Sequence, residues 1–562
     1  MDFDEVLPSD WCVEGSTGYD FLNQLNSLFI AVQNEAEATL FYHRFTGCKE
    51  SFDELLYACR KSVVRSLFRG DVDNLARVLR QLLKANTVQL TKKMSTDLLV
   101  ELMVAFPVYR TYCTESQISK SDHNVLEITF ETAKRRNPQL EKELSALQRL
   151  LEQSPPSSGA AAWLMRLQQY TGAVIAKGME DTALYIFNRL LSLNEVGGNP
   201  FRFGRSDSEF HKLMKLRQAG LRNSLNASST HDTKRGEDSR ARLNVLSEIP
   251  QEFGNQVAQW AEINLKKKRL VKGKVTPAPN EEYYIYQSLL ASFPFDEAET
   301  AEFQLRLKQH MIKALREAKI NSSWLQPNES YEEAITAFVN QIVDTNQRST
   351  FMNKFMPFQK KIAYFGFLNS LSQTLIKIVS PGIPDFYQGS ELWNLNMVDP
   401  DNRRPVDFVK RQKLLKETQK TLCTKLGELL DSYSDGKAKI YLINHALKFR
   451  NSKRDLFQQG DYIPLKAKGA HAENIIAFCR KKSADWTLAL APRFVYTMMN
   501  GEQSLPLRDA WKDTTVLLPK DAPVRWKDIF SGNTISSGDG LKVADAMEAF
   551  SVCLLTPTEA EK

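Results

Sequence analysis

Three polar stretches, rich in Gly, Pro and Asp, constrain the fold of this chain more than any other feature. They are residues 15–21, 229–242 and 380–405, and long blocks of helical periodicity separate them. Gly, Pro and Asp clusters are typical of turns and loops, but these stretches are too polar and too rich in these three residues for ordinary connectors. We therefore expect the chemistry of the protein to lie on these three segments.

The blocks between them have the spacing of amphipathic helices. In residues 31–152, Leu75, Val78, Leu79 and Leu82 recur every three or four residues, with charges on the opposite face. The Ser/Pro/Gly-rich segment 154–159 predicts a loop. Helical patterning then resumes as far as residue 193 and again over about 236–375, interrupted by a predicted polar loop at 266–280.

The patterning changes after about residue 430. Short β-rich runs at 474–478, 486–490, 514–518 and 550–555 are separated by turn signals. Such spacing predicts a small antiparallel β domain appended to the helix-rich part.

Composition excludes several classes of protein. The 562 residues are 42% hydrophobic and 25% charged, as in ordinary globular proteins. The excess of 74 basic over 67 acidic residues gives a net charge of +7, too mild for a dedicated nucleic-acid binder. Residues 1–5 are acidic, unlike a secretory signal, and the most apolar run, 98–106, is too short to span a membrane. Seven scattered cysteines without a C-x-x-C pair indicate reduced thiols, so we expect a cytoplasmic protein without a metal site.

The second polar stretch contains a His-Asp pair. His231 and Asp232 can hydrogen-bond neighbouring hydroxyls of a sugar, and the carboxylate can stabilise positive charge that develops on the ring. The alternative is structural, because Thr233 or Asp232 can cap a helix that carries Glu237. In the third stretch, Arg403 with its neighbouring Arg and Asp residues is either a sugar-binding rim or a surface ion-pair cluster.

Several longer motifs resemble a known family. The run Lys-Gly-Met-Glu-Asp-Thr-Ala-Leu-Tyr at 177–185, together with 188–198, 230–235 and 381–405, closely resembles the malto-oligosyltrehalose synthases. These are trehalose-forming members of the α-amylase superfamily. The resemblance extends to residues 11–21 and 280–294 and to the C-terminal β-rich segment, so it covers essentially the whole chain.

The resemblance implies an α/β fold, a (β/α)₈ TIM barrel with large helical insertions and a C-terminal antiparallel β-sandwich. Active sites of such barrels lie on loops at the carboxyl ends of the strands. In this chain 18–20 matches the sixth-strand region, His231 and Asp232 match the pair after the seventh strand, and 383–389 matches the eighth. The implied parts are a barrel segment at 1–30, a mainly helical insertion at 31–222, the remaining barrel segments at 223–425 and a β domain at 426–562.

The family's reaction is an intramolecular transfer of a glucosyl group. The α-1,4 bond to the reducing-end glucose of a malto-oligosaccharide is converted to an α,α-1,1 bond, which leaves a terminal trehalose unit. Net retention at the anomeric carbon requires a carboxylate nucleophile and a second carboxyl group that acts as acid and then base. The chemistry implies an isomerase that needs no cofactor.

This sequence departs from the family in one respect, because the nucleophile and the acid/base are not found. The family's nucleophile lies in an R-x-D motif after the fourth strand, and its acid Glu follows the fifth. The two R-x-D strings, 69–71 and 205–207, lie downstream of the sixth-strand match, and we interpret them as accidental. We therefore expect the chain to begin just after the acid Glu. Three of eight strands cannot close a barrel, so we expect the chain to be inactive alone.

Two explanations of this departure remain. The missing N-terminal half of the barrel is encoded upstream, as part of a split or mis-started enzyme, or it is lost, which leaves a non-catalytic carbohydrate-binding remnant. A third hypothesis makes the basic run 266–274 a polyanion-binding site, although such a run is also typical of a solvated loop.

The resemblance also implies the roles of single residues. Asp232 is the expected transition-state stabiliser, and His231 is expected to bind an adjacent hydroxyl group. Lys177 resembles a lysine that reaches toward the reducing-end glucose, but a salt bridge with Glu180 or Asp181 is the alternative. Tyr19 either stacks on a sugar face or belongs to the core, as does Trp11. The other expected substrate-binding residues are Thr233, Lys234, Arg235 and Arg403.

Overall fold

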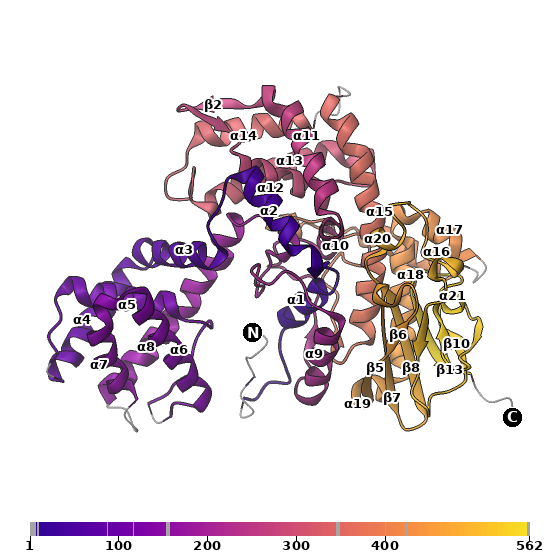
Figure 1. Cartoon of the computed structure of the whole chain (residues 1–562), viewed down its shortest axis with the longest axis horizontal. Helices are drawn as coiled ribbons and strands as arrows, with labels where there is room; N and C mark the ends of the chain where they lie inside the picture. The colour runs from indigo at the N-terminus through magenta and orange to yellow at the C-terminus, as the bar shows by residue number, and fades with distance from the viewer. Residues whose placement is uncertain are drawn as a thin grey trace.

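The computed structural model describes residues 7, 11–86, 88–115, 117–152, 158–343, 349–399, 401–421 and 425–558. Most of the predicted loop at 154–159, and Cys423, lie outside these ranges. Among the described residues, helices are the main elements of the chain as far as Gln459, with four short strands between them, and the longer antiparallel sheets follow. Figure 1 shows a lobe of α3–α8 on one side, α11–α14 above the centre, and the β-rich end on the other side.

The lobe of α3–α8 has its own hydrophobic core. Leu75 and Leu79 are buried there, and Val78 and Leu82 pack against it, so the predicted helical spacing is confirmed. The side chains of Ser51, Thr91 and Ser119 cap three of the helices at their N-termini. The helices are α3 (Phe52–Ser66), α4 (Arg69–Ala85), α5 (Lys92–Ala105), α6 (Lys120–Arg136), α7 (Glu141–Leu151) and α8 (Ser158–Ile175).

The three predicted barrel segments lie side by side at the centre. β1 (Leu225–Asn226) pairs in parallel with β4 (Ile383–Pro384), and the backbone N–H of Leu225 donates to Ser16 O at 3.0 Å. Gly18 follows with φ +93°, and a Cβ there would lie 2.5 Å from Leu225 O, so only glycine fits. In the described residues, Ser16 is therefore next to β1 and β1 is next to β4. The full barrel stays a prediction.

Helices on either side complete this central part. The longest, α15 (Thr350–Val379), is the one helix in the described residues that is long and apolar enough to cross a membrane, and its apolar window is entirely buried inside the structure. It packs against α10 (Glu237–Val245). The other helices of this part are α1 (Tyr19–Ser27), α2 (Glu35–Thr46), α9 (Asp207–Gly220), α11 (Pro250–Asn264), α12 (Pro279–Ser292), α13 (Thr300–Ala318) and α14 (Glu329–Ile342).

The predicted polar loop at 266–280 is wrong. It contains an antiparallel hairpin of β2 (Arg269–Val271) and β3 (Lys274–Thr276), turned by Lys272 and Gly273 at positive φ, and α12 begins within it. Two cations of this segment are engaged within the protein: Lys268 pairs with Glu282 at 2.6 Å, and Lys267 lies over the ring of Phe351. These contacts leave a smaller basic patch than the sequence indicated.

The C-terminal part begins with helices rather than with the β structure expected from residue 426. Ala438, Leu442, Ala446 and Phe449 are buried at helical spacing, which explains why this segment forms α18. The first strand of the C-terminal sheets begins only at Asp461. The helices are α16 (Phe408–Thr418), α17 (Leu426–Asp431), α18 (Lys437–Ser452) and α19 (Arg454–Gln459).

Two antiparallel sheets follow, with strand orders β11-β10-β13-β8-β7-β5 and β12-β9-β6. Side chains of both sheets, among them Leu488 and Val516, belong to one hydrophobic cluster, while Phe478 and Leu554 on the other face join the main core with α15. The strands are β5 (Asp461–Pro464), β6 (Lys466–Lys468), β7 (Ile475–Lys482), β8 (Asp485–Pro492), β9 (Thr515–Leu517), β10 (Arg525–Asp528), β11 (Thr534–Ser536), β12 (Leu541–Lys542) and β13 (Cys553–Pro557).

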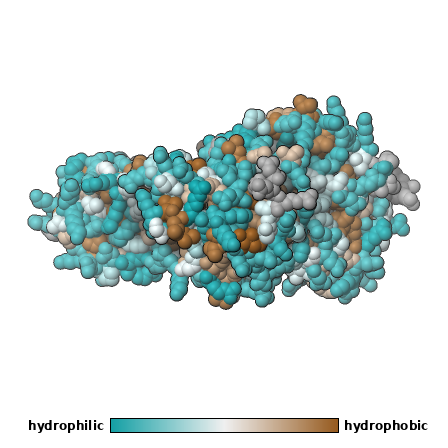
Figure 2. All heavy atoms as spheres, turned by 90° about the horizontal axis from the view of Figure 1, so that it is seen from above, coloured by the Kyte–Doolittle hydropathy of each residue, from teal (hydrophilic) through white to brown (hydrophobic). Residues whose placement is uncertain are grey.

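The surface is mainly hydrophilic. Figure 2, a view from above, shows hydrophobic side chains only in scattered patches on that face. Exposed apolar residues also occur singly, for example Leu40 and Leu216, as is normal for globular proteins.

Candidate functional site

The loop after β1 positions the His-Asp pair. Thr233 Oγ1 donates to Thr230 O at 3.0 Å, and Thr230 Oγ1 accepts from the backbone N–H of Asp232 at 3.1 Å. Helix α10 begins at Glu237 with Gly236 as its N-cap. The capping alternative is therefore wrong, because Thr233 closes its own turn and neither it nor Asp232 caps the helix. The Asp232 carboxylate is half-buried, and no cap or turn contact to it is found among the described residues.

The segment after β4 holds the His-Asp loop from the other side. Asn402 Nδ2 donates to His231 O at 3.0 Å, and Arg403 Nε donates to the same oxygen at 3.4 Å. Arg403 also pairs with Asp399 at 3.3 Å, and its side chain is 50% exposed. The guanidinium thus steadies the backbone of His231, and the ion pair that we considered as an alternative is present as well.

Tyr19, the first residue of α1, lies against the same loop. Its hydroxyl is 3.2 Å from Thr230 Oγ1. Burial raises the pKa of the phenol, the hydrogen bond to Thr230 lowers it, and the negative charges of Asp232 and Glu195 raise it further. Tyr19 therefore lies beside Asp232 and near Glu195, within reach of both negative charges.

A carboxylate joins the two predicted lysines. Asp181 accepts from Lys177 Nζ at 2.7 Å and from Lys234 Nζ at 3.0 Å. Burial raises the pKa of Asp181, but the two ammonium groups outweigh burial and hold the pKa below its usual range. The salt bridge considered for Lys177 is therefore formed with Asp181, while Glu180 instead accepts from the Tyr109 hydroxyl and from the N–H of Gly197. Lys177, at 53% side-chain exposure, remains accessible to a ligand.

Arg235 does not join this group at the surface. It is 3% exposed, and its guanidinium lies 5.2 Å from the ring centroid of Tyr284 and donates to Leu191 O. It therefore points into the core, away from the rim where the sequence suggested it.

Glu195 is a residue that the sequence analysis missed. This buried carboxylate accepts from the backbone N–H groups of Lys234 and Arg235 at 2.6 and 3.3 Å, and from Arg240 Nη1 at 3.0 Å. It thereby fixes the backbone that follows Asp232. An acidic residue inside the apolar run 190–196 was the available signal, because a buried Glu requires a partner.

Both R-x-D strings lie at helix starts, not at strand ends. Asp71 is in the first turn of α4 and accepts from the Tyr170 hydroxyl at 2.9 Å. Asp207 is the first residue of α9, which Ser206 caps. Neither aspartate has the setting of a barrel nucleophile. Among the described residues, no group of three or more His, Cys, Asp or Glu side chains is arranged to hold a metal ion.

Comparisons with known proteins agree with the motifs. No family model matches the chain. Two curated Mycobacterium tuberculosis proteins named "Putative maltooligosyl trehalose synthase" are 29% identical over 536 residues, which is 95% of this chain and 62% of theirs. The solved maltooligosyltrehalose synthase of Arthrobacter ramosus has a TM-score of 0.83 at 28% identity, over 99% of this chain and 65% of that one.

A further solved structure, described as a maltooligosyl trehalose synthase, is 32% identical with a TM-score of 0.73, and this chain covers 64% of it. The predicted resemblance is thus confirmed over nearly all of the sequence. The chain spans about 62% of the length of the curated relatives it matches. Each relative is one longer chain, so the comparisons give no support to the predicted separate partner.

Proposed function

We propose that this chain, a relative of the malto-oligosyltrehalose synthases, forms the sugar-binding side of such an enzyme's active site and that its substrate is a malto-oligosaccharide. The observation that carries the proposal is the convergence of Tyr19, Asp232 and the Lys177–Asp181–Lys234 group, which come from three segments far apart in sequence. In the proposed fold, Ser16, β1 and β4 belong to the sixth, seventh and eighth strands of a (β/α)₈ barrel, and the two C-terminal sheets form a β-sandwich.

Asp232 takes the role of transition-state stabiliser. Breaking a glycosidic bond places positive charge on the ring, and hydrogen bonds to ring hydroxyls strengthen as that charge develops. The capping contacts that would otherwise occupy the carboxylate are made by other groups, so Asp232 is free to accept from two adjacent hydroxyls, with His231 beside it.

Lys177 and Lys234 form the site for the reducing-end glucose that is turned over. Asp181 holds both ammonium groups in one place. An ammonium group has three donors, so the exposed Lys177 keeps donors for a sugar hydroxyl, while Lys234, 7% exposed, acts through Asp181. Tyr19 offers a ring face to the sugar, and Arg403 fixes the backbone of His231.

The bond-breaking carboxylates lie outside this group. No R-x-D string is at a strand end in the described residues, so we propose that these 562 residues alone do not form trehalose ends. Loss of a nucleophile costs on the order of a million-fold in rate in well-studied hydrolases. The proposed function of the chain alone is therefore binding, and the transfer requires the family's nucleophile and acid.

The test is a calorimetric titration of the purified chain with maltopentaose, with cellopentaose as the β-linked control. Saturable binding of maltopentaose alone supports the proposal, and absence of binding contradicts it. Reducing ends are then counted after long incubation with maltopentaose. Their number stays constant if the proposal is correct, while a fall would mean that the chain contains its own nucleophile and acid.

A further inference from the structure

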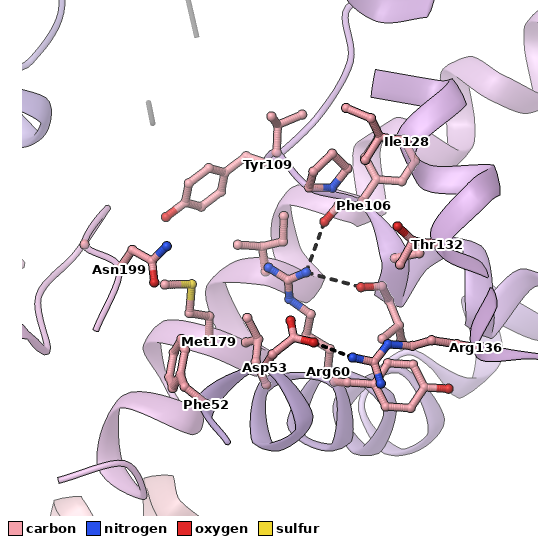
Figure 3. Close-up of a pocket in the computed structure, with 18 of the residues that line it drawn as sticks. Phe52, Asp53, Arg60, Phe106, Tyr109, Ile128, Thr132, Arg136, Met179 and Asn199 are labelled. Atoms are coloured by element: carbon pink, nitrogen blue, oxygen red, sulfur yellow. Dashed lines mark hydrogen bonds and ion pairs between the residues drawn. The ribbon is translucent and has the colours of Figure 1, made fainter. Parts of the chain in front are cut away.

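A cavity of about 330 Å³ lies where the α3–α8 lobe meets the centre of the molecule. Figure 3 shows its lining residues arranged around the guanidinium of Arg60, which extends from α3 toward Tyr109 and Met179. The volume is at the lower end of the range of about 300–1,000 Å³ found for small-molecule sites. The proposed function assigns no role to this cavity.

Arg60 is the unusual group in the lining. It is 9% exposed, and its Nη1 donates to the carbonyl oxygens of Val104 and Phe106 at 3.2 and 3.0 Å. Its Nε has no hydrogen-bond partner among the described residues. The guanidinium therefore donates to neutral carbonyl groups. Burial lowers the pKa of Arg60, while Asp53 is near enough for its charge to raise it, but among the described residues no carboxylate forms an ion pair with Arg60.

The other arginine of the cavity provides the comparison. Arg136 pairs with Asp53 at 2.5 Å and with Glu54 at 3.0 Å, and it stacks on the ring of Tyr57. Asp53 is thus engaged by Arg136, on the side of the cavity below Arg60 in Figure 3. A buried charge without a counter-ion is costly. An anion that enters the cavity would supply the counter-ion that Arg60 lacks among the described residues.

The position of Arg60 is rigid. Gly178 packs on it so closely that a Cβ would lie 2.8 Å from Arg60 Cα, and two carbonyl groups hold Nη1. Burial lowers the pKa of the guanidinium to about 10, which still leaves it charged at neutral pH. The site is therefore preorganised for an anion, since the protein does not need to move to present the charge.

We propose that this cavity binds a small organic anion of about the size of a sugar phosphate, with its phosphate or carboxylate group paired to Arg60. The rest of the cavity suits a polar ring. Phe52 and Tyr109 offer aromatic surface, and Thr132 and Asn199 offer hydrogen-bonding groups. Glu180, which accepts from the Tyr109 hydroxyl, is not part of the lining. This inference does not depend on the proposed sugar transfer.

The probes are glucose 6-phosphate, glucuronate and inorganic phosphate, with glucose as the neutral control, each titrated into the full chain by calorimetry at low salt. We expect glucose 6-phosphate or glucuronate to bind at least tenfold more tightly than glucose, because one charged hydrogen-bonded contact is worth about that factor. The two ligands distinguish a phosphate from a carboxylate site. Equal affinity for glucose and both anions, or no binding of either anion, overturns the proposal.

Variants locate the site. Arg60→Met removes the charge at similar volume, and its matched control is Arg65→Met, on the same helix at 56% side-chain exposure. The first is expected to weaken anion binding at least tenfold and the second to leave it unchanged. Equal effects of the two variants contradict the assignment of Arg60.

Ile128 gives a test that does not depend on a buried residue, because it lines the cavity and is 52% exposed. Ile128→Glu is expected to weaken anion binding severalfold and Ile128→Lys to strengthen it, since the added charges have opposite signs at the same place. Effects in the same direction for both variants would show that charge does not govern binding at this cavity.

Discussion

The carboxylate of Glu195 and the guanidinium of Arg240 are 3.0 Å apart, and their side chains are only 1% and 2% exposed. Arg240 also donates to the carbonyl oxygens of Ser228 and Arg235, at the two ends of the His-Asp loop. The pair therefore clamps the loop that carries Asp232 onto helix α10. Because both side chains are buried, replacing either one leaves the other as an unpaired charge in the interior.

The variant Glu195→Gln tests this clamp. We expect a loss of roughly 3–5 kcal/mol in the free energy of unfolding, because the change leaves Arg240 buried without a counter-ion. Thermal unfolding of the variant is compared with that of Glu37→Gln, an exposed position on α2. Equal unfolding temperatures of the two variants would contradict a clamp formed by Glu195 and Arg240.

Glycine at position 18 is a second structural requirement. Gly18→Ala introduces a side chain at φ +93° and only 2.5 Å from Leu225 O, so we expect a cost of about 2–4 kcal/mol from strain and backbone displacement. The control is Gly220→Ala at the end of α9, where a Cβ meets open space. Urea unfolding should separate the two variants clearly, and similar midpoints would contradict the close packing of residues 16–18 on β1.

Glu248 makes stability depend on pH. Burial raises the pKa of this carboxyl to about 7, although the N–H and hydroxyl of Thr497 donate to it at 2.9 Å and lower the value. A folded-state pKa above the unfolded value of about 4.5 means that the folded protein keeps a proton that the unfolded chain releases. The protonated Glu248 therefore adds to the free energy of unfolding below pH 4.5. This added stability, roughly 3 kcal/mol at most, is lost as the pH rises through 7.

The variant Glu248→Gln removes this titration. Urea unfolding midpoints measured between pH 5 and pH 8 should therefore fall less for the variant than for the parent chain. Glu37→Gln serves again as the control and should follow the parent. Parallel curves for the parent and Glu248→Gln would mean that the carboxyl group is ionised in the folded protein over the whole range.

The spacing of apolar residues predicted helices and strands correctly where apolar side chains recur regularly along the segment. The spacing of Leu75 and Leu79 was sufficient for α4, and the runs around 474–478 and 486–490 were sufficient for β7 and β8. The spacing failed for the hairpin β2–β3, because strands of three residues are too short to show an alternation of apolar side chains. The sequence pattern also failed to predict α18. It placed the change from helices to strands at about residue 430, whereas the first strand of the C-terminal sheets begins at Asp461.

The site residues divide in the same way. Motif resemblance drew attention to Lys177, Asp232 and Arg403 because the family motifs imply a role for each of them, whereas the run 188–198 implies none for Glu195. Glu195 escaped because its partner Arg240 is 45 residues away and only the folded chain brings them together. The burial of Arg60 against the carbonyl groups of 104–106 is a tertiary contact of the same kind.

The most direct test of the account is the affinity of the full chain for maltopentaose with and without the Asp232 carboxylate. Asp232→Asn is titrated by calorimetry beside Asp539→Asn, an exposed position in the turn between β11 and β12. We expect Asp232→Asn to weaken binding about tenfold or more, since it removes a charged acceptor of sugar hydroxyls, and Asp539→Asn to bind like the parent. Unchanged affinity of Asp232→Asn would contradict a sugar-binding site built around the His-Asp loop.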